Sequence, residues 1–261
     1  MFSLEGKVAV ITGGGSGIGL AAVQRFSQAG AKVVIADLND QTELAREVGG
    51  LYVQADVSKE HEVQSLMDQA AEKYGKIDLV FNNAGIGGMK GLLTENGIEN
   101  FEKAFQINTF GVLYGIKHAV KYMEHGGAIV NAASMAGIRG YAASGPYVSS
   151  KFSVVGLTMT AALELASQKI RVNCICPGKV ATPMVDWESD SLKQATNQLI
   201  PLGRYAKPEE VASLVHYLCS DEASYITGQA ISIDGGLSSG VGTGAIAQLM
   251  KNAESKFSTI S

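Results

Sequence analysis

A tyrosine and a lysine stand four residues apart in "SGPYVSSKFSVVGLT", residues 144–158. Pro146 is typical of the first turn of a helix, and the spacing puts Tyr147 and Lys151 on one helix face. An ammonium near a phenol favours the phenolate, which lowers the phenol pKa from about 10 and makes tyrosine a usable general acid or base. Ser134 ends the run "GAIVNAAS", where its hydroxyl could hold a carbonyl oxygen for that tyrosine. Each feature alone is more often structural, but together they predict a general acid or base placed at a carbonyl oxygen.

Glycines separate an apolar run from an apparent helix in "VAVITGGGSGIGLAAVQRF", residues 8–26. Ile18, Ala22 and Phe26 recur at helical spacing, so the pattern is strand, tight turn and helix. Such a turn lets backbone N–H groups approach a pyrophosphate, whose charge the positive end of the helix stabilises. A glycine turn that only packs the helix on the strand is the alternative. The residues predicted to contact the phosphates are Gly13, Ser16, Gly17, Ile18 and Gly19.

An acid closes the next strand-like run, "KVVIAD", about twenty residues after the glycines, where a carboxylate accepts hydrogen bonds from an adenosine ribose. This residue, Asp37, would repel a 2′-phosphate, and neither Leu38 nor Ser16 supplies an arginine to receive one. NAD is therefore favoured over NADP, although a solvated acid at a strand end is the alternative. Asp56 ends the run "LYVQAD" and either bonds the adenine edge or caps the following helix.

The elements that must position these residues are seven short apolar runs alternating with longer helical stretches. Their near-continuous apolar character predicts strands covered on both faces, as in a parallel sheet flanked by helices. Right-handed crossovers then give an α/β fold, a single doubly wound Rossmann domain with a seven-stranded parallel sheet. No linker divides residues 1–261, and only the Gly/Ser-rich stretch 238–261 extends beyond the last strand. The expected strands are "KVAVIT", "KVVIAD", "LYVQAD", "IDLVFNNAG", "GAIVNAAS", "IRVNCICPG" and "AISIDGG".

Composition excludes several classes of protein. A net charge of −4 without a Lys/Arg block disfavours nucleic acid as a partner. No apolar stretch approaches the roughly 20 residues of a membrane span, and "MFSLEGK" lacks the basic flank of a signal peptide, so we expect no membrane contact and a cytoplasmic location. The three cysteines and four histidines form no zinc pattern, which predicts buried free thiols and no metal.

Five motifs, taken in order and spacing, resemble the short-chain dehydrogenase/reductase family. They are TGxxxGIG at 12–19, "NNAG" at 82–85, Ser134, "YVSSK" at 147–151 and "PG" at 177–178. The similarity runs from about residue 5 to "TGQAISIDGG", which defines a core of about residues 5–237. The resemblance implies an NAD-dependent oxidoreductase that interconverts a secondary alcohol and a ketone.

The resemblance also assigns roles to particular residues. Tyr147 would exchange the proton with the substrate oxygen, Ser134 would orient that oxygen, and Lys151 would hold the nicotinamide ribose. Asn108, in "QINTFG", would support a water that leads protons to the lysine. Asn83 would lie beneath the adenosine ribose and steady the sheet. The further cofactor contacts that the resemblance implies are Val57, Ala84, Gly85, Pro177, Gly178, Val180 and Thr182.

A helical segment of about residues 184–206 closes the substrate pocket in this family. The resemblance thus suggests a pocket for a cyclic or moderately apolar alcohol or ketone. Relatives commonly form homotetramers, and the tail 238–261 either folds over an active site or is a frayed terminus. The residues expected to line the pocket are Met135, Arg139, Tyr141, Met184 and Trp187, with Arg139 either reading a carboxylate or lying on the surface.

Two other functions remain open. A 3-oxoacyl-thioester reductase would prefer NADPH, against which Asp37 argues. A noncatalytic dinucleotide-binding sensor would keep the fold without the chemistry, and the intact set of serine, tyrosine and lysine argues against it.

Overall fold

One parallel sheet organises the chain. The structure, a computed structural model, describes residues 2–88, 90–247 and 250, and within them the strand order is β3-β2-β1-β4-β5-β6-β7. All neighbouring strands pair in parallel, which confirms the predicted doubly wound α/β fold. The strands are β1 (Val8–Thr12), β2 (Lys32–Asp37), β3 (Leu51–Gln54), β4 (Leu79–Asn82), β5 (Gly127–Ala132), β6 (Ile170–Pro177) and β7 (Ala230–Ile233).

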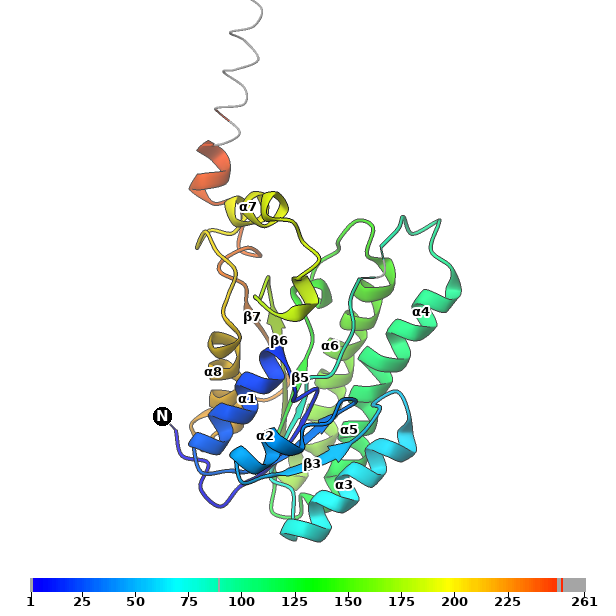
Figure 1. Ribbon diagram of the computed structural model, residues 1–261, viewed down its shortest axis with the longest axis vertical. Helices are drawn as coiled ribbons and strands as arrows, with labels where there is room; N and C mark the ends of the chain where they lie inside the picture. Colours follow the sequence, from blue (N-terminus) through cyan, green and yellow to red (C-terminus); the bar gives the residue numbers. More distant parts are fainter. Residues whose placement is uncertain (1, 89, 248–249, 251–261) are drawn as a thin grey trace, which may run out of the picture.

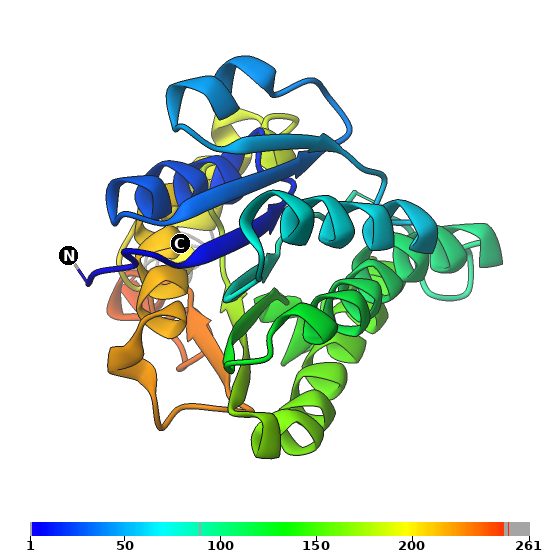
Figure 2. The ribbon, with the colours of Figure 1, turned by 90° about the horizontal axis from the view of Figure 1, so that it is seen from below.

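Two layers of helices cover the sheet, as Figures 1 and 2 show from two sides. The helices are α1 (Gly17–Gln28), α2 (Thr42–Glu47), α3 (Glu60–Tyr74), α4 (Ile98–Phe105), α5 (Gly111–Ala119), α6 (Gly145–Leu165), α7 (Asp190–Leu199) and α8 (Pro208–Cys219). Val10 of β1 packs with α3, α5 and α6 on one face, whereas Ala9 and Ile11 pack with α1 and α8 on the other. Because both faces are buried, the strands read as unbroken apolar runs.

The strand order reverses between β1 and β4, which places a crevice at the carboxyl ends of these two strands. The glycine loop follows β1 and the "NNAG" motif follows β4, so they meet at this reversal. The ends of β5 and β6, which carry Ser134 and the "PG" motif, continue along the same edge. The fold therefore gathers the predicted chemistry on one edge of the sheet.

The described part of the tail contains a helical turn at 243–247, and the rest of the helix expected there lies outside the described residues. Among the helices that the structure describes, none combines the length and the apolar character needed to cross a membrane. The three cysteines are free and buried, as predicted.

A buried histidine ties the N-terminus to two helices. His216 of α8 is fully buried, and its Nε2 lies 2.9 Å from the carbonyl oxygen of Phe2. Arg25 of α1 donates its Nε–H to Nδ1 of the same ring at 3.0 Å, so the ring must be neutral to accept it. Burial lowers the pKa of His216, and the Arg25 guanidinium lowers it further.

We expect this histidine to make the fold sensitive to acid. The pKa of His216 in the folded protein lies below its ordinary value, which applies in the unfolded chain. The contribution of the neutral ring to folding stability is therefore complete when the pH is above the ordinary pKa, and it is lost as the pH falls through the folded-state pKa. Between about pH 7.5 and about pH 5.5, the melting temperature of the wild type should fall further than that of His216→Gln, whose amide keeps one donor and one acceptor but does not titrate. An equal loss in both proteins would contradict this role.

Candidate functional site

The glycine loop exposes the start of α1. Gly13 and Gly17 have φ values of +63° and +52°, the left-handed region that glycine adopts without strain. A Cβ at Gly19 would lie 2.0 Å from the carbonyl oxygen of Gly13, so only glycine fits there. Among the described residues no side chain caps α1 at Ser16, which leaves its first N–H groups facing the cavity described below. This end of the helix fits an anionic pyrophosphate.

Asp37 is tied directly to that loop. Its Oδ2 accepts a hydrogen bond from the Gly15 N–H at 3.0 Å, and its Oδ1 accepts one from the Asn39 N–H at 3.1 Å. The neighbouring Leu38 is 61% exposed. The carboxylate is therefore held at the end of β2 beside the glycine loop, and its contact with an adenosine ribose stays a prediction.

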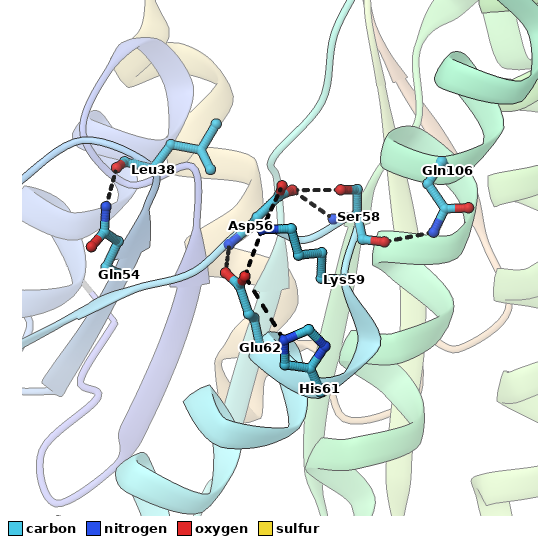
Figure 3. Close-up of polar contacts among 8 residues, drawn as sticks. All are labelled: Leu38, Gln54, Asp56, Ser58, Lys59, His61, Glu62 and Gln106. Carbon is cyan, nitrogen blue, oxygen red and sulfur yellow. Dashed lines mark hydrogen bonds and ion pairs between the residues drawn. The ribbon is translucent and has the colours of Figure 1, made fainter. Parts of the chain in front are cut away.

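Asp56 lies in a polar cluster between β3 and α3 (Figure 3). Its Oδ1 accepts hydrogen bonds from the Ser58 N–H at 3.0 Å and the Ser58 hydroxyl at 2.7 Å. Lys59 Nζ is 3.7 Å from Oδ2, and the Asp56 N–H donates to Glu62 Oε2 at 2.7 Å. These contacts are those of a residue that organises the start of α3, and an additional contact with adenine stays a prediction.

Asn83 joins the two sides of the strand reversal. Its Nδ2 donates to the carbonyl oxygens of Thr12 and Gly13, at 2.9 and 3.1 Å. In return, the Thr12 hydroxyl accepts hydrogen bonds from the N–H groups of Asn83 and Ala84, at 3.0 and 3.1 Å. The loop after β4 is thus fixed to the glycine loop after β1, which shapes the crevice between them.

Ser134, Tyr147 and Lys151 meet at the ends of β5 and α6. Ser134 follows β5, and its Oγ accepts a hydrogen bond from the Ala136 N–H at 3.1 Å. Tyr147 lies in the first turn of α6, with Lys151 one turn later. The Lys151 Nζ donates to the Ala132 carbonyl oxygen at 2.8 Å and lies 5.8 Å from the centre of the Tyr147 ring. The spacing of four does place both side chains on one face.

Burial governs the ionisation of this pair. It raises the pKa of Tyr147 above its ordinary value, although the adjacent Ser134 hydroxyl acts in the opposite direction. It lowers the pKa of Lys151 to about 8. The sequence predicts that Lys151 lowers the pKa of Tyr147, whereas in the structure burial of the phenol raises it, with the Lys151 Nζ 5.8 Å from the ring centre.

Asn108 sits in a π-helical turn, Gln106–Phe110, that interrupts the passage from α4 to α5. Its side chain is fully buried. Its Oδ1 accepts a hydrogen bond from the Ile86 N–H at 2.8 Å, and its Nδ2 donates to the Ile86 carbonyl oxygen and to Ser150 Oγ, both at 3.0 Å. Such turns are frequent at functional sites, and this one aims the amide at the loop after β4.

A cavity of about 540 Å³ connects these groups. It runs from the glycine loop past the "NNAG" motif to Ser134, Tyr147 and Lys151. Its wall includes these residues predicted for cofactor or substrate: Gly13, Ser16, Gly17, Ile18, Asn83, Ala84, Gly85, Ser134, Tyr147, Lys151, Pro177, Gly178, Val180, Thr182, Met184 and Trp187. Within the described chain, no group of three His, Cys, Asp or Glu side chains is placed to hold a metal ion.

A family model described as enoyl-(acyl carrier protein) reductase matches residues 13–238. The mitochondrial borneol dehydrogenase of Lavandula x intermedia is 41% identical over 240 residues, which cover 90% of this chain and 92% of that protein. This chain belongs to the short-chain dehydrogenase/reductase family. It is therefore related to oxidoreductases that bind a nicotinamide dinucleotide, and the glycine loop at the start of α1 fits such a cofactor.

Two further short-chain dehydrogenase/reductase relatives cover nearly their whole length. The 3-oxoacyl-(acyl-carrier-protein) reductase of Thermotoga maritima is 40% identical over 243 residues, which cover 90% of this chain and 98% of that protein. The crystal structure of levodione reductase superposes with a TM-score of 0.87 at 36% identity, over 92% of this chain and 99% of that one. The predicted resemblance and fold are confirmed by these matches.

The structure separates the candidate substrate residues of this short-chain dehydrogenase/reductase. Met184 and Trp187 line the cavity. Met135 does not belong to the cavity wall; it is buried at the start of the short 3₁₀ helix Met135–Gly137, which follows Ser134. Arg139 donates to the Leu237 carbonyl oxygen at 2.8 Å, and its guanidinium carbon is 5.9 Å from the centre of the Tyr141 ring. Neither Arg139 nor Tyr141 belongs to the cavity wall. The predicted cofactor residues outside that wall are Gly19, Asp37, Leu38, Asp56 and Val57.

Sequence reasoning missed three residues near the cavity mouth. Lys179 lines the cavity, although the sequence motifs single out only its neighbours Gly178 and Val180. Glu188 is buried in a segment whose composition predicts exposure, and Lys90 packs on Trp187 from a loop distant in sequence. In the sequence near Glu188, only the large apolar side chain of Trp187 indicates that this part of the segment packs against another part of the protein.

Proposed function

We propose that this protein is an NAD(H)-dependent oxidoreductase that interconverts a secondary alcohol and a ketone. The observation that carries the proposal is the single cavity whose wall contains the glycine loop at one end and Ser134, Tyr147 and Lys151 at the other. Membership of the short-chain dehydrogenase/reductase family supports the same reading. When bound, the nicotinamide carries the hydride, so the protein supplies orientation and the proton.

Tyr147 acts as the general acid or base in this proposal. Burial keeps its phenol protonated at neutral pH, which suits donation of the proton to a ketone oxygen. Ser134, which already lies close enough to influence the tyrosine, orients that oxygen. Lys151 projects into the cavity wall beside both and holds the cofactor ribose, while Asn108 fixes the loop carrying Ile86 behind it.

Asp37 gives the preference for NAD. Its carboxylate lies at the end of β2 and is oriented by the glycine loop, so it can accept hydrogen bonds from a ribose diol. The same charge repels a 2′-phosphate, and the adjacent Leu38 offers no cation. NADP is accordingly the less favoured cofactor.

The substrate is a small cyclic or moderately apolar molecule in this proposal, because Met184 and Trp187 supply apolar surface to the cavity that Tyr147 also lines. The names of the borneol dehydrogenase and levodione reductase relatives are consistent with small alcohols and ketones. We expect neither nucleic acid nor a membrane as a partner. Exposed apolar side chains on α5 and α6 support assembly into a homotetramer, among them Leu113, Phe152, Met159 and Leu163.

A 3-oxoacyl-thioester reductase is the second candidate. It is favoured by the Thermotoga maritima relative, whose name gives that activity. That function would be expected with NADPH, which the position of Asp37 disfavours. The choice of cofactor therefore discriminates between the two candidates.

The test is absorbance at 340 nm with purified protein, NAD or NADP, and a panel of cyclic, steroidal, sugar-like and hydroxy-acid alcohols. A 3-oxoacyl thioester with NADH or NADPH completes the panel. We expect turnover of a cyclic alcohol with NAD at a kcat/KM at least about tenfold above that with NADP. Turnover of the thioester with NADPH alone would support the second candidate, and tight NADH binding without turnover of any compound would favour a noncatalytic sensor.

A further inference from the structure

The segment 179–206, which we call the cover segment, leaves the sheet after β6 and returns to it before α8. Its two ends are joined by backbone hydrogen bonds. The Ala206 N–H donates to the Lys179 carbonyl oxygen, and the Ala181 N–H donates to the Ala206 carbonyl oxygen, both at 2.9 Å. The residues between these ends extend beyond the ends of β6 and β7 as a loop that carries α7 (Figure 1). Thr182, Met184 and Trp187 of this loop belong to the cavity wall.

A carboxylate anchors this loop. Among residues 181–199, all of which the structure describes, Glu188 alone is buried, with 3% of its surface exposed, and the buried apolar residues of the cover segment, Val180 and Ile200, lie outside this stretch. Buried apolar side chains usually fix a segment to the body of a protein, and charged ones are almost never fully buried unless paired. The burial of Glu188 is therefore explained by its hydrogen-bond partners and not by a hydrophobic contact.

Those partners come from the two ends of the cover segment. Lys179 donates from Nζ to Glu188 Oε1 at 2.5 Å, and Tyr205 donates from its hydroxyl to Glu188 Oε2 at 2.5 Å. Burial alone would raise the pKa of Glu188, but these two donors hold it below its ordinary value. A buried charge with two directional partners contributes little net stability but specifies one geometry. The start, middle and end of the segment therefore converge on one carboxylate.

The residue before this anchor is Trp187, which lines the cavity together with Met184. The Trp187 Nε1–H donates to the Met184 carbonyl oxygen at 3.0 Å. From the opposite side, Lys90 of the loop after β4 places its Nζ 3.3 Å from the centre of the indole ring. The position of Glu188 therefore fixes the position of the neighbouring indole, which lies between the cover segment and the loop after β4 at the cavity mouth.

We infer that Glu188 is a positioning residue that locks the cover segment, through Lys179 and Tyr205, so that Trp187 and Met184 form the substrate-facing wall of the cavity. The role in substrate binding rests on the proposed oxidoreductase function, whereas the locking of the segment does not. Glu188 reaches neither the substrate nor the cofactor, and it acts only through the residues that it holds.

Trp187 is the only tryptophan of the chain, so its fluorescence reports on the segment directly. In Glu188→Gln the ion pair with Lys179 is lost, and the amide oxygen can accept a hydrogen bond from only one of the two donors. The NH₂ group keeps a contact with the Tyr205 hydroxyl only if that hydroxyl turns to accept, which is weaker than donation to a carboxylate. We expect the amplitude of the nanosecond component of the Trp187 anisotropy decay, which reports local motion of the indole, to grow by about twofold or more in this variant. Tyr205→Phe, which keeps the charge and removes one donor, should give a smaller change in the same direction.

Asp186→Asn is the matched control, because it removes the same charge from an exposed position two residues away. Its anisotropy decay should equal that of the wild type. On a substrate identified by the panel, Glu188→Gln should raise KM about fivefold to tenfold with a smaller change in kcat, as expected for loss of a charged hydrogen bond that shapes a binding wall. The control should leave both constants within about twofold.

Wild-type anisotropy in both Glu188→Gln and Tyr205→Phe would overturn the proposal, and so would a fall in the melting temperature of Glu188→Gln without a change at Trp187. The fluorescence measurement needs no substrate. A failure of the oxidoreductase proposal would therefore still leave the locking of the segment tested. Conversely, wild-type anisotropy of Trp187 in Glu188→Gln and Tyr205→Phe of an active enzyme would refute the lock alone.

Discussion

Replacement of Tyr147 by Phe should lower kcat by about 10³-fold or more, because general acid–base catalysis contributes about 10²–10⁴-fold and this phenol is the proton donor or acceptor in the proposed reaction. The substitution removes one oxygen from a residue that lines the cavity and leaves its ring in place. NADH binding should change by less than about twofold, since the variant loses an interaction made in the transition state. Stopped-flow rates with saturating cofactor and a fluorescence titration with NADH measure the two quantities.

The direction of the pH dependence follows from the same residue. Burial raises the pKa of Tyr147, so the phenol is protonated at neutral pH and must lose its proton before it can accept one from an alcohol. Alcohol oxidation should therefore accelerate as the pH rises, whereas ketone reduction should slow once the phenol ionises. Burial also lowers the pKa of Lys151 to about 8, so its ammonium charge is present near neutrality and is lost at a lower pH than that at which the phenol ionises.

Tyr225→Phe serves as the control for this variant, because Tyr225 is fully exposed and carries the same phenol. It should retain wild-type rates. A Tyr147→Phe enzyme that turns over within about tenfold of the wild type would show that another group transfers the proton, and the assignment of the general acid would be wrong.

The sheet and its ligand-binding edge could be predicted because their causes are local. A strand buried on both faces needs an unbroken apolar run, and the run around Val10, Ala9 and Ile11 supplies one core on each side. A turn that approaches a pyrophosphate needs glycine, and a Cβ at Gly19 would meet the backbone at 2.0 Å. These requirements are written in residue types at short spacing, so sequence reasoning reached them.

The contacts around the cavity mouth could not be predicted in the same way, because they join distant parts of the chain. Lys90 and Trp187 are nearly a hundred positions apart, yet the ammonium lies on the indole ring. Arg139 follows a strand end as expected, but the Leu237 carbonyl oxygen draws its guanidinium away from the cavity wall. The π-helical turn at Asn108 depends on the backbone of Ile86, 22 residues earlier. No periodicity within the sequence reports such pairings.

Glu188 illustrates the limit most directly. Its neighbours are exposed, and an acid in such a stretch is normally solvated. It is buried only because Lys179 and Tyr205 meet it from the two ends of the cover segment. Sequence reasoning that works from hydrophobic patterns cannot find a segment that is anchored by charge.

Cofactor choice should be reversible at two neighbouring positions. Combining Asp37→Asn with Leu38→Arg should shift the ratio of kcat/KM for NAD to kcat/KM for NADP by about 10²-fold or more toward NADP, since it removes a repulsive charge and adds a cation for the 2′-phosphate. Asn can still accept the hydrogen bond from the Gly15 N–H, so the glycine loop keeps its tie to β2. Leu38 is 61% exposed, which leaves room for the longer arginine side chain.

Asp40→Asn separates this local effect from a change in the overall field, because it removes the same charge from an exposed residue three positions further along the chain. If Asp37 selects the cofactor by direct contact with the ribose, the control leaves the ratio within about twofold of the wild type, because an exposed charge beyond the contact is screened by water and salt. If the control shifts the ratio as far as Asp37→Asn does, selection arises from the general negative potential at the end of β2. Wild-type preference for NADP would contradict the role of Asp37 outright, and the carboxylate held by the Gly15 N–H would then serve only to brace the glycine loop.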